Sequence, residues 1–410
     1  MDKDKIELLA PAGDLEKLKY AVIYGADAVY FGGEMFSLRA GAGNLTVEEM
    51  KEGIEFAHSK GVKCYLTVNI FAHNEDVKPL ENYLNRIKDL PIDGFIVSDP
   101  GVISIIKNII PDGELHLSTQ ANMTNYMTAR FWHRQGVKRI VLARELTFGE
   151  IAQLCAETSG ELEYEAFVHG AMCISYSGRC LLSNFMNERD ANRGQCSHPC
   201  RWKYALVEEK RPGEYYKVEE DDRGTYIMNS RDLCMIEHIP ELVKSGLSSL
   251  KIEGRMKSVF YVATVVNAYR RAIDAFYNNP DSYEFDSGLL DEVKKVSHRE
   301  FTTGFYFNKP TNKDQNYQTS AYTRDYVFVG VVKSYDEATG YAIVEQRNKM
   351  NIGDEIEVFG PGADYFIQTI DEMYDEEGTP VESAPHPQQI LKMKMLKPVK
   401  EYDILRKKEK

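Results

Sequence analysis

Eight short apolar segments alternate with mostly helical segments over the first 275 residues of this chain, and few folds are compatible with that alternation. The apolar segments are predicted strands at residues 6–12, 28–33, 64–70, 94–99, 114–120, 139–145, 162–170 and 249–255. Near-continuous apolar strands joined by helices are typical of a parallel sheet covered on both faces. Eight such units in about 250 residues match a closed (β/α)8 barrel. No G-x-G-x-x-G follows the first strand, which disfavours a doubly wound dinucleotide-binding sheet.

The pattern changes twice along the chain and predicts three further regions. An irregular, cysteine-rich stretch interrupts the alternation after the seventh strand, so we expect an insertion at 171–236 within a TIM-like α/β barrel spanning 1–279. Residues 280–324 are polar and aromatic and are predicted to be a connector. From 325 to 410, short alternating strands are separated by turn residues such as "DEATG" and "NIGD", which favours a small all-β barrel domain.

Composition limits the class of protein and its compartment. The formal net charge of −13 argues against a uniformly basic nucleic-acid-binding surface, although a local basic patch on an acidic protein is enough to hold RNA. The start of the chain has no basic segment followed by an apolar one, and no run of about 18 apolar residues occurs, so neither a secretory signal nor a membrane span is expected. We therefore predict a cytoplasmic protein whose thiols are kept reduced.

Four of the seven cysteines are crowded into one segment with the spacing C-x6-C-x15-C-x3-C: Cys173, Cys180, Cys196 and Cys200. A reducing compartment and an odd cysteine count disfavour disulfides. Four thiolates match the ligand set of an iron–sulfur cluster, whereas zinc, which soft thiolates also suit, stays open. The segment is also compatible with a catalytic thiol, in which His169 activates Cys173, or with plain buried cysteines.

The active site of such a barrel lies at the carboxyl ends of its strands. The polar residues predicted there are Glu34, Asn69, Asp99, Gln120, Arg144, Glu145, His169, Glu253 and Arg255. Arg144 and Arg255 could clamp a carboxylate, because a guanidinium group matches it with two hydrogen bonds. Glu145, Glu253 and His169 are the types of residue that do acid–base work. The alternative is a rim of ion pairs, Arg144 with Glu145 and Arg255 with Glu253, and a histidine that only bonds to a loop.

Several motifs together resemble peptidase family U32, also called collagenase-like, over essentially the whole chain. They are "ELLAPAGDLEKLKYAVIYGADAVYFGG", "EAFVHGAMCISYSGRCLLS", "GQCSHPCRWKY", "NSRDLC" and "SLKIEGRMKS". The chain is most similar to the branch of tRNA 5-hydroxyuridine modification proteins. That resemblance implies oxygen-independent hydroxylation of a tRNA wobble uridine, with prephenate as a dicarboxylate co-substrate. The predicted barrel mouth independently offers Asn69, Gln120, Arg144 and Arg255 as substrate-binding candidates.

The resemblance also implies a [4Fe–4S] cluster on Cys173, Cys180, Cys196 and Cys200, with Cys234 as a rival fourth ligand. The family name offers the alternative of a peptidase, and a non-catalytic cluster-binding partner protein is a third. The chain contains neither a G-x-S-x-G elbow nor an H-E-x-x-H helix, and a ligating thiolate cannot also be a free nucleophile. The terminal β domain would dock RNA or protein, and a homo- or hetero-oligomer with a related family member is left open.

Overall fold

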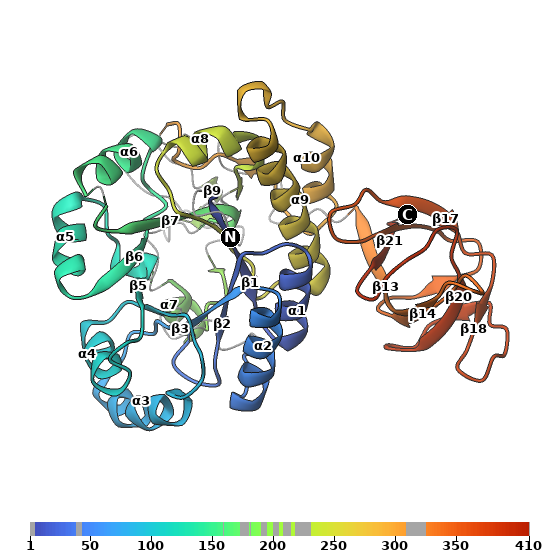
Figure 1. Cartoon of the computed structure of the whole chain (residues 1–410), viewed down its shortest axis with the longest axis horizontal. Helices are drawn as coiled ribbons and strands as arrows, with labels where there is room; N and C mark the ends of the chain where they lie inside the picture. Colours follow the sequence, from blue (N-terminus) through green and yellow to red (C-terminus); the bar gives the residue numbers. More distant parts are fainter. Residues whose placement is uncertain are drawn as a thin grey trace.

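The computed structural model describes most of the chain. The described residues are 5–37, 43–158, 160–172, 180, 182–189, 195–199, 205–207, 215–217, 231–308 and 325–409. Figure 1 shows a barrel ringed by helices and a β domain beside it, on the side of α9 and α10.

Eight parallel strands close into a barrel, which confirms the predicted (β/α)8 fold (Figure 1). They are β1 (Glu7–Ala12), β2 (Ala28–Gly32), β3 (Lys63–Val68), β4 (Gly94–Val97), β5 (Leu115–Leu117), β6 (Val137–Val141), β7 (Glu163–Ala171) and β11 (Ser249–Ile252). The ring closes through β11, where Ser249 is in register with Glu7 of β1 on one side and with Glu165 of β7 on the other. The last barrel strand therefore pairs with the first.

Helices begin where the sequence supplies capping side chains. Thr46 and Glu49 form a capping box at the start of α2, and the Asp99 carboxylate accepts from the N–H groups of Gly101 and Val102 at the start of α4. The barrel helices are α1 (Leu15–Ile23), α2 (Val47–Ser59), α3 (Asn74–Ile87), α4 (Pro100–Ile109), α5 (Tyr126–Arg134), α6 (Phe148–Glu157), α8 (Ile239–Lys244) and α9 (Val259–Asn278). Asp99, predicted at the barrel mouth, is thus a helix cap.

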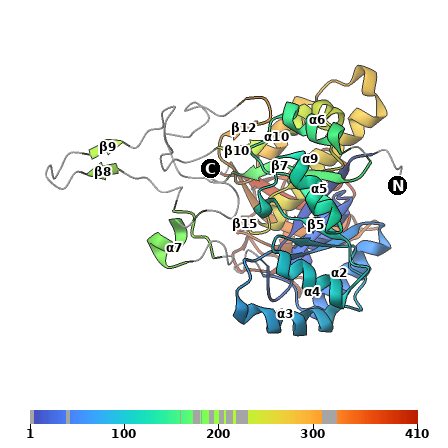
Figure 2. The ribbon, with the colours of Figure 1, turned by 90° about the vertical axis from the view of Figure 1, so that its left-hand side faces the viewer.

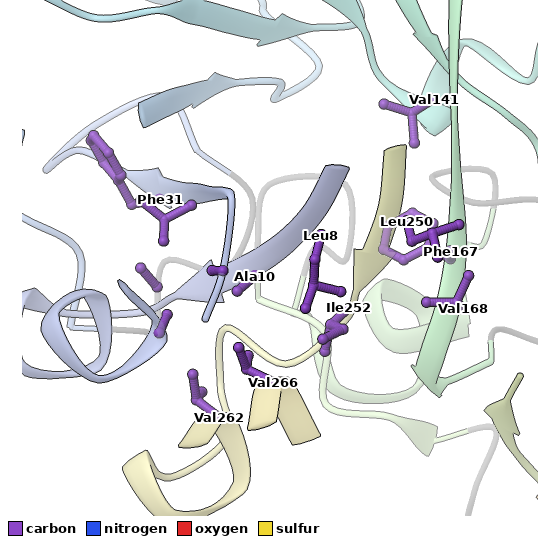
Figure 3. Close-up of a cluster of buried hydrophobic side chains, with 14 of the residues drawn as sticks. Leu8, Ala10, Phe31, Val141, Phe167, Val168, Leu250, Ile252, Val262 and Val266 are labelled. Atoms are coloured by element: carbon purple, nitrogen blue, oxygen red, sulfur yellow. The ribbon is translucent and has the colours of Figure 1, made fainter. Parts of the chain in front are cut away.

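These helices pack on the outside of the barrel through a continuous layer of buried apolar side chains. Leu8 of β1 and Ile252 of β11 pack with Val262 and Val266 of α9, and all four are fully buried (Figure 3). Burying each such side chain contributes about 1.5–3 kcal/mol. α9 is the longest helix, yet in the described ranges no helix is both long and apolar enough to cross a membrane.

Six of the eight barrel strands stop earlier than predicted at their carboxyl ends, the exceptions being β1 and β7. β5 ends at Leu117, β6 at Val141 and β11 at Ile252, so the polar residues expected at the ends of these strands lie just beyond them. Gln120, for example, belongs to a short 3-10 turn, η1 (Thr119–Ala121).

An insertion separates β7 from β11 and adds one strand, β10 (Asp232–Cys234), to β7. The end of β7 pairs antiparallel with β10, which in turn pairs with β12 (Phe301–Thr302). The insertion also contains α7 (Leu182–Asn187) and the paired strands β8 (Ala205–Val207) and β9 (Tyr215–Lys217). Figure 2 shows α7, β8 and β9 on the side of the barrel opposite to the N-terminus, where the barrel strands end.

The C-terminal part forms a seven-stranded antiparallel sheet curled around a core of its own, in the order β17-β16-β21-β13-β14-β20-β18. Its strands are β13 (Tyr326–Asp336), β14 (Tyr341–Gln346), β16 (Glu355–Phe359), β17 (Phe366–Thr369), β18 (Met373–Tyr374), β20 (Ile390–Lys394) and β21 (Ile404–Lys408), with β15 (Met350–Asn351) pairing β19 (Ser383–Ala384). The region predicted as a connector contributes α10 (Ser287–Lys294) and β12, so part of it is regular structure.

Candidate active site at the barrel mouth

Arg255 lies at the carboxyl end of β11 and is almost fully buried. Its Nη1 donates to Ser37 Oγ at 2.7 Å and to Thr67 Oγ1 at 3.0 Å, and its Nη2 donates to Asn44 Oδ1 at 2.8 Å. A Cβ on Gly32 would lie 2.5 Å from Nη2, so the glycine at the end of β2 makes room for the guanidinium group. Arg255 therefore ties the segment after β2 to β3 and β11 through neutral oxygens, and its role as a carboxylate clamp stays a prediction.

Arg144 follows β6 and is only half-buried. Its Nη1 donates to the carbonyl oxygen of Ala171, the last residue of β7, at 2.6 Å, and its guanidinium carbon lies 3.9 Å from the centre of the Phe167 ring. In the described part of the chain, its buried Nε has no hydrogen-bond partner. Arg144 is thus held against the Phe167 ring, and its Nε–H is a candidate donor to a ligand.

Glu145 is the neighbour of Arg144 in the chain. Burial raises the pKa of its carboxyl group above the ordinary value, against the opposing effects of its own backbone N–H and of the Arg144 charge. A carboxyl group whose pKa is raised in this way can give or take a proton nearer neutral pH than an exposed one. The predicted acid–base role of Glu145 is therefore compatible with its surroundings.

Gln120 and Asn69 are joined through one serine at the carboxyl ends of β3 and β5. Asn69 Nδ2 lies 3.5 Å from Ser118 Oγ, which lies 3.4 Å from Gln120 Oε1. Gln120 is 3% exposed, and its Nε2 has no hydrogen-bond partner among the described residues. A buried amide N–H without a partner is costly, by about 1–3 kcal/mol, so this group is a candidate donor to a bound ligand.

His169 lies on the outer side of the barrel wall, beneath α9. Its ring centre is within 6.0 Å of the rings of Tyr261, Tyr269 and Phe301. Burial, together with the charges of Lys257 and His298, lowers the pKa of His169 to about 3, so the imidazole is neutral at pH 7. This position supports a packing role at the junction of β7, β10 and β12, and it lends no support to the predicted acid–base role.

Glu253 lies between the barrel axis and this junction. Its backbone N–H donates to the carbonyl oxygen of His169 at 2.9 Å, and the Tyr30 hydroxyl group lies 3.4 Å from its carboxylate. Tyr30 comes from β2 and points into the barrel. Glu253 is therefore placed at the mouth by backbone pairing, and its acid–base role stays a prediction.

Two of the predicted cluster cysteines, Cys173 and Cys200, lie outside the described residues. Cys180 and Cys196 are half-buried, and the polypeptide around them is linked: Ser197 N donates to Ser183 Oγ at 2.9 Å, and Asn187 Nδ2 donates to Ser197 Oγ at 2.7 Å. These bonds hold the segment that follows Cys196 against α7, which begins two residues after Cys180.

The sulfur of Cys180 accepts from the backbone N–H of Leu182 at 3.4 Å. Backbone N–H groups aimed at a ligand sulfur stabilise thiolates that hold iron, so this part of the insertion fits the chemistry of an iron–sulfur ligand. Cys234 is opposite His169 in the β7–β10 pair, and burial raises the pKa of its thiol to about 12. Cys234 thus sits at the root of the insertion, but its sulfur packs 4.0 Å from the Tyr269 hydroxyl group.

A buried charge network inside the barrel was missed in the sequence. Arg139 lies between Glu7 and Glu165, at 2.5 Å and 3.5 Å, and Lys251 Nζ lies 2.7 Å from Glu165. The Tyr65 hydroxyl group donates to Glu7 at 2.8 Å. A signal was present for Glu7 and Lys251, which are the single charges of β1 and β11, whereas Arg139 and Glu165 share their strands with Lys138 and Glu163. This network fills the barrel below the mouth.

One other group among the described residues could hold a metal ion. His58, Cys64 and Asp93 offer ligand atoms within 4.8 Å of one another. Asp93 Oδ2, however, already accepts from the backbone N–H of Cys64 at 2.7 Å and lies 2.8 Å from His58 Nε2. The three residues are accounted for by this hydrogen bonding between α2, β3 and the segment before β4.

Comparison with known proteins agrees with this combination of barrel, insertion and β domain. Residues 13–316 match the model of peptidase family U32, and residues 324–406 match the family's C-terminal domain. The chain belongs to peptidase family U32. The U32 chain is 45% identical to tRNA hydroxylation protein P1 of Bacillus subtilis (strain 168), over 98% of this chain and 95% of that protein.

Two further U32 relatives carry different names. The chain is 37% identical to tRNA hydroxylation protein P of Escherichia coli (strain K12), over 93% of this chain and 92% of the relative. It is 34% identical to a collagenase of Porphyromonas gingivalis (strain ATCC BAA-308 / W83), over 95% of each chain. Membership of U32 therefore leaves both RNA modification and proteolysis open.

Proposed function

We propose that this U32 protein is a tRNA-modifying enzyme that hydroxylates the wobble uridine of tRNA to 5-hydroxyuridine without molecular oxygen. Prephenate is the proposed co-substrate, and a [4Fe–4S] cluster on the insertion cysteines is the proposed cofactor. The names of the B. subtilis and E. coli relatives favour tRNA hydroxylation. The observation that carries the proposal is Arg144, which joins the barrel mouth to the end of β7, two residues before Cys173.

Arg144 is the proposed carboxylate clamp. Its bond to the Ala171 carbonyl group and its contact with Phe167 fix the plane of the guanidinium group, so little freedom is lost when a carboxylate binds. Gln120 Nε2 supplies a second donor from the neighbouring strand end. A dicarboxylate held by these groups would lie beside the start of the cysteine segment.

Glu145 is the proposed proton carrier, because its raised pKa suits proton exchange with the uridine ring or the co-substrate. A cluster held by the insertion cysteines would supply redox-active iron. Arg255, Ser37 and Asn44 hold the β2 side of the mouth in place through their hydrogen bonds.

Nucleoside analysis of tRNA tests the proposed function directly. In a strain that lacks this gene and any redundant enzyme, 5-hydroxyuridine and the nucleosides derived from it should disappear, and the wild-type gene should restore them. Purified protein should leave gelatin and collagen peptides intact. Unchanged nucleosides together with gelatin cleavage would instead assign the peptidase function.

Replacing Arg144 with lysine should lower tRNA hydroxylation at limiting prephenate by about tenfold or more, because lysine cannot form the paired hydrogen bonds of a guanidinium group. The Michaelis constant for prephenate should rise, while iron content and melting temperature stay near those of the wild type. Lys78→Arg on α3, where the side chain is 78% exposed, is the control and should change nothing. Wild-type kinetics for Arg144→Lys would rule out the clamp.

Anaerobic purification should yield a brown protein with iron and sulfide in equal amounts. Cys180→Ser and Cys196→Ser should each lose iron, whereas Cys155→Ser, whose half-buried thiol faces the carbonyl group of Gly246, should keep it. Of Cys200→Ser and Cys234→Ser, only the variant that removes the fourth ligand should lose iron. Stoichiometric zinc with no iron in the wild-type protein would contradict the cluster.

A further inference from the structure

Thirty consecutive residues, 115–144, contain no aspartate or glutamate in a chain that has 63 of them. The same stretch contains five basic residues: Arg130, Arg134, Lys138, Arg139 and Arg144. Arg139 is neutralised inside the barrel by Glu7, and Arg130 lies 3.8 Å from the Glu157 carboxylate. Arg134 and Lys138 are exposed, and no carboxylate in the described part of the chain lies within ion-pair distance of either.

The helix in this stretch, α5, turns large apolar side chains to the outside. Met127 is 58% exposed and Phe131 is 48% exposed, and of the nine residues of the helix only Ala129 is buried. Met127 and Phe131 are four residues apart, so they are neighbours on one face. A surface helix normally buries its apolar stripe, and a stripe left outside indicates an interaction surface.

This face begins at the barrel mouth. The Asn125 side chain caps α5 by accepting from Thr128 N at 2.9 Å, and the η1 turn that carries Gln120 comes just before this cap. Figure 1 shows α5 on the side of the barrel away from the C-terminal domain. An extended ligand that enters the mouth could therefore continue over α5 without meeting that domain.

We propose that the outer face of α5, formed by Met127, Phe131 and Arg134, together with Lys138 at the start of β6, binds single-stranded RNA that continues from the nucleotide entering the mouth. This inference rests on the proposed function. Unstacked bases of an RNA loop pack on exposed aromatic rings, and the two cations attract the phosphate groups. A second copy of the chain fits less well, because a two-fold interface would set the cations of one α5 against those of the other.

The apolar half of the surface is tested with Met127→Ser/Phe131→Ser in the full-length protein. The dissociation constant for an unmodified transcript of a tRNA with a wobble uridine should rise about tenfold, since each stacked base contributes that much or more. Val77→Ser on α3 is the control, because this apolar side chain is 39% exposed and lies on another barrel helix. Melting temperature and iron content should be unchanged in both proteins.

The cationic half is tested by salt dependence. In Arg134→Gln/Lys138→Gln, the slope of log affinity against log salt concentration should fall by about two, because each phosphate contact contributes about one. Lys78→Gln/Lys88→Gln, which removes two exposed cations from the region of α3, should keep the wild-type slope.

The outcomes separate this inference from the proposed function. If the wild-type protein binds tRNA and both α5 variants bind it equally well, the α5 surface is refuted and the tRNA function stands. If the wild-type protein does not bind tRNA, the α5 surface and the proposed tRNA function are both refuted. Loss of self-association in sedimentation velocity, with unchanged tRNA affinity, would assign α5 to an interface between two copies and overturn the RNA surface.

Discussion

Replacing Arg139 with methionine should lower the free energy of unfolding by about 3–5 kcal/mol, although the residue lies outside the barrel mouth. Arg139 is 4% exposed and sits between Glu7 and Glu165, which are buried as well. Methionine fills much of the volume but leaves one more negative charge than positive charge in the barrel. Because Lys251 can pair with Glu165 alone, Glu7 is the group that loses its partner.

The loss of unfolding free energy in Arg139→Met should depend on pH, and the ionisation of Glu7 decides whether it grows or shrinks as the pH rises. In the wild-type protein burial raises the pKa of Glu7, but the Arg139 charge and the hydrogen bonds from Arg139, Tyr65 and Ser249 outweigh it, so the pKa lies below its ordinary value. That stabilisation is present above the ordinary pKa and is lost only as the pH falls through the lowered one. Without Arg139, burial dominates, the pKa of Glu7 rises, and the folded state loses stability as the pH rises.

Denaturant unfolding of the two proteins at pH 5.5 and pH 8 measures this effect. The difference in unfolding free energy should be larger at pH 8, and Glu7→Gln added to Arg139→Met should recover part of it. Lys19→Met is the control, because its pair with Glu52 is partly exposed and should be worth at most about 1 kcal/mol. A loss no larger than that of the control would mean that the barrel charges are solvated.

Replacing Arg406 with methionine should loosen the C-terminal domain from the barrel, at a loss of about 3 kcal/mol or more. Arg406 of β21 is fully buried and lies 2.7 Å from Glu357 and 2.8 Å from Glu292, while Lys295 lies 2.8 Å from each of these glutamates. Glu292 and Lys295 come from the α10 region of the barrel part, so the cluster joins the two parts of the chain. The guanidinium carbon is also 4.5 Å from the centre of the Phe359 ring.

Hydrogen exchange is the suitable measurement, because a chain with two hydrophobic cores need not unfold in one step. Backbone amides of β16 and β21 should exchange faster in Arg406→Met, whereas those of β2 and β3 should not. Arg271→Met removes another ion pair between the two parts, to Asp364, but that aspartate is 84% exposed. Equal effects of the two substitutions would show that burial of the Arg406 cluster contributes nothing.

The barrel could be predicted because each strand is a local apolar pattern, but contacts between distant segments could not. Glu7 is the one charge of β1 and Arg139 follows Lys138 in β6, and the two meet only because β1 and β6 belong to one closed ring. His169 was expected at the mouth because it ends a strand. Instead, β7 and β11 shift register between Lys251 and Ile252, and the imidazole lies beneath α9.

For the cysteines too, local features could be predicted from the sequence and contacts between distant segments could not. The number and spacing of the cysteines predicted a thiolate site, and the contact between Leu182 and Cys180 is local enough to follow from that segment. Cys234 reaches β7 through a three-residue strand, β10, which has no sequence period to recognise. Its place opposite His169, sixty-five residues away, depends on tertiary pairing.

The order in which the ring closes has a consequence for synthesis of the protein. β11 supplies both final pairings, to β1 and to β7, so the nascent chain holds two unpaired strand edges until residue 252 has left the ribosome. Unpaired edges recruit other strands and promote aggregation. The segment from Cys173 to Cys234 is translated before β11. All the candidate cysteine ligands have therefore been synthesised, and can meet a metal ion or cluster, while the barrel is still open.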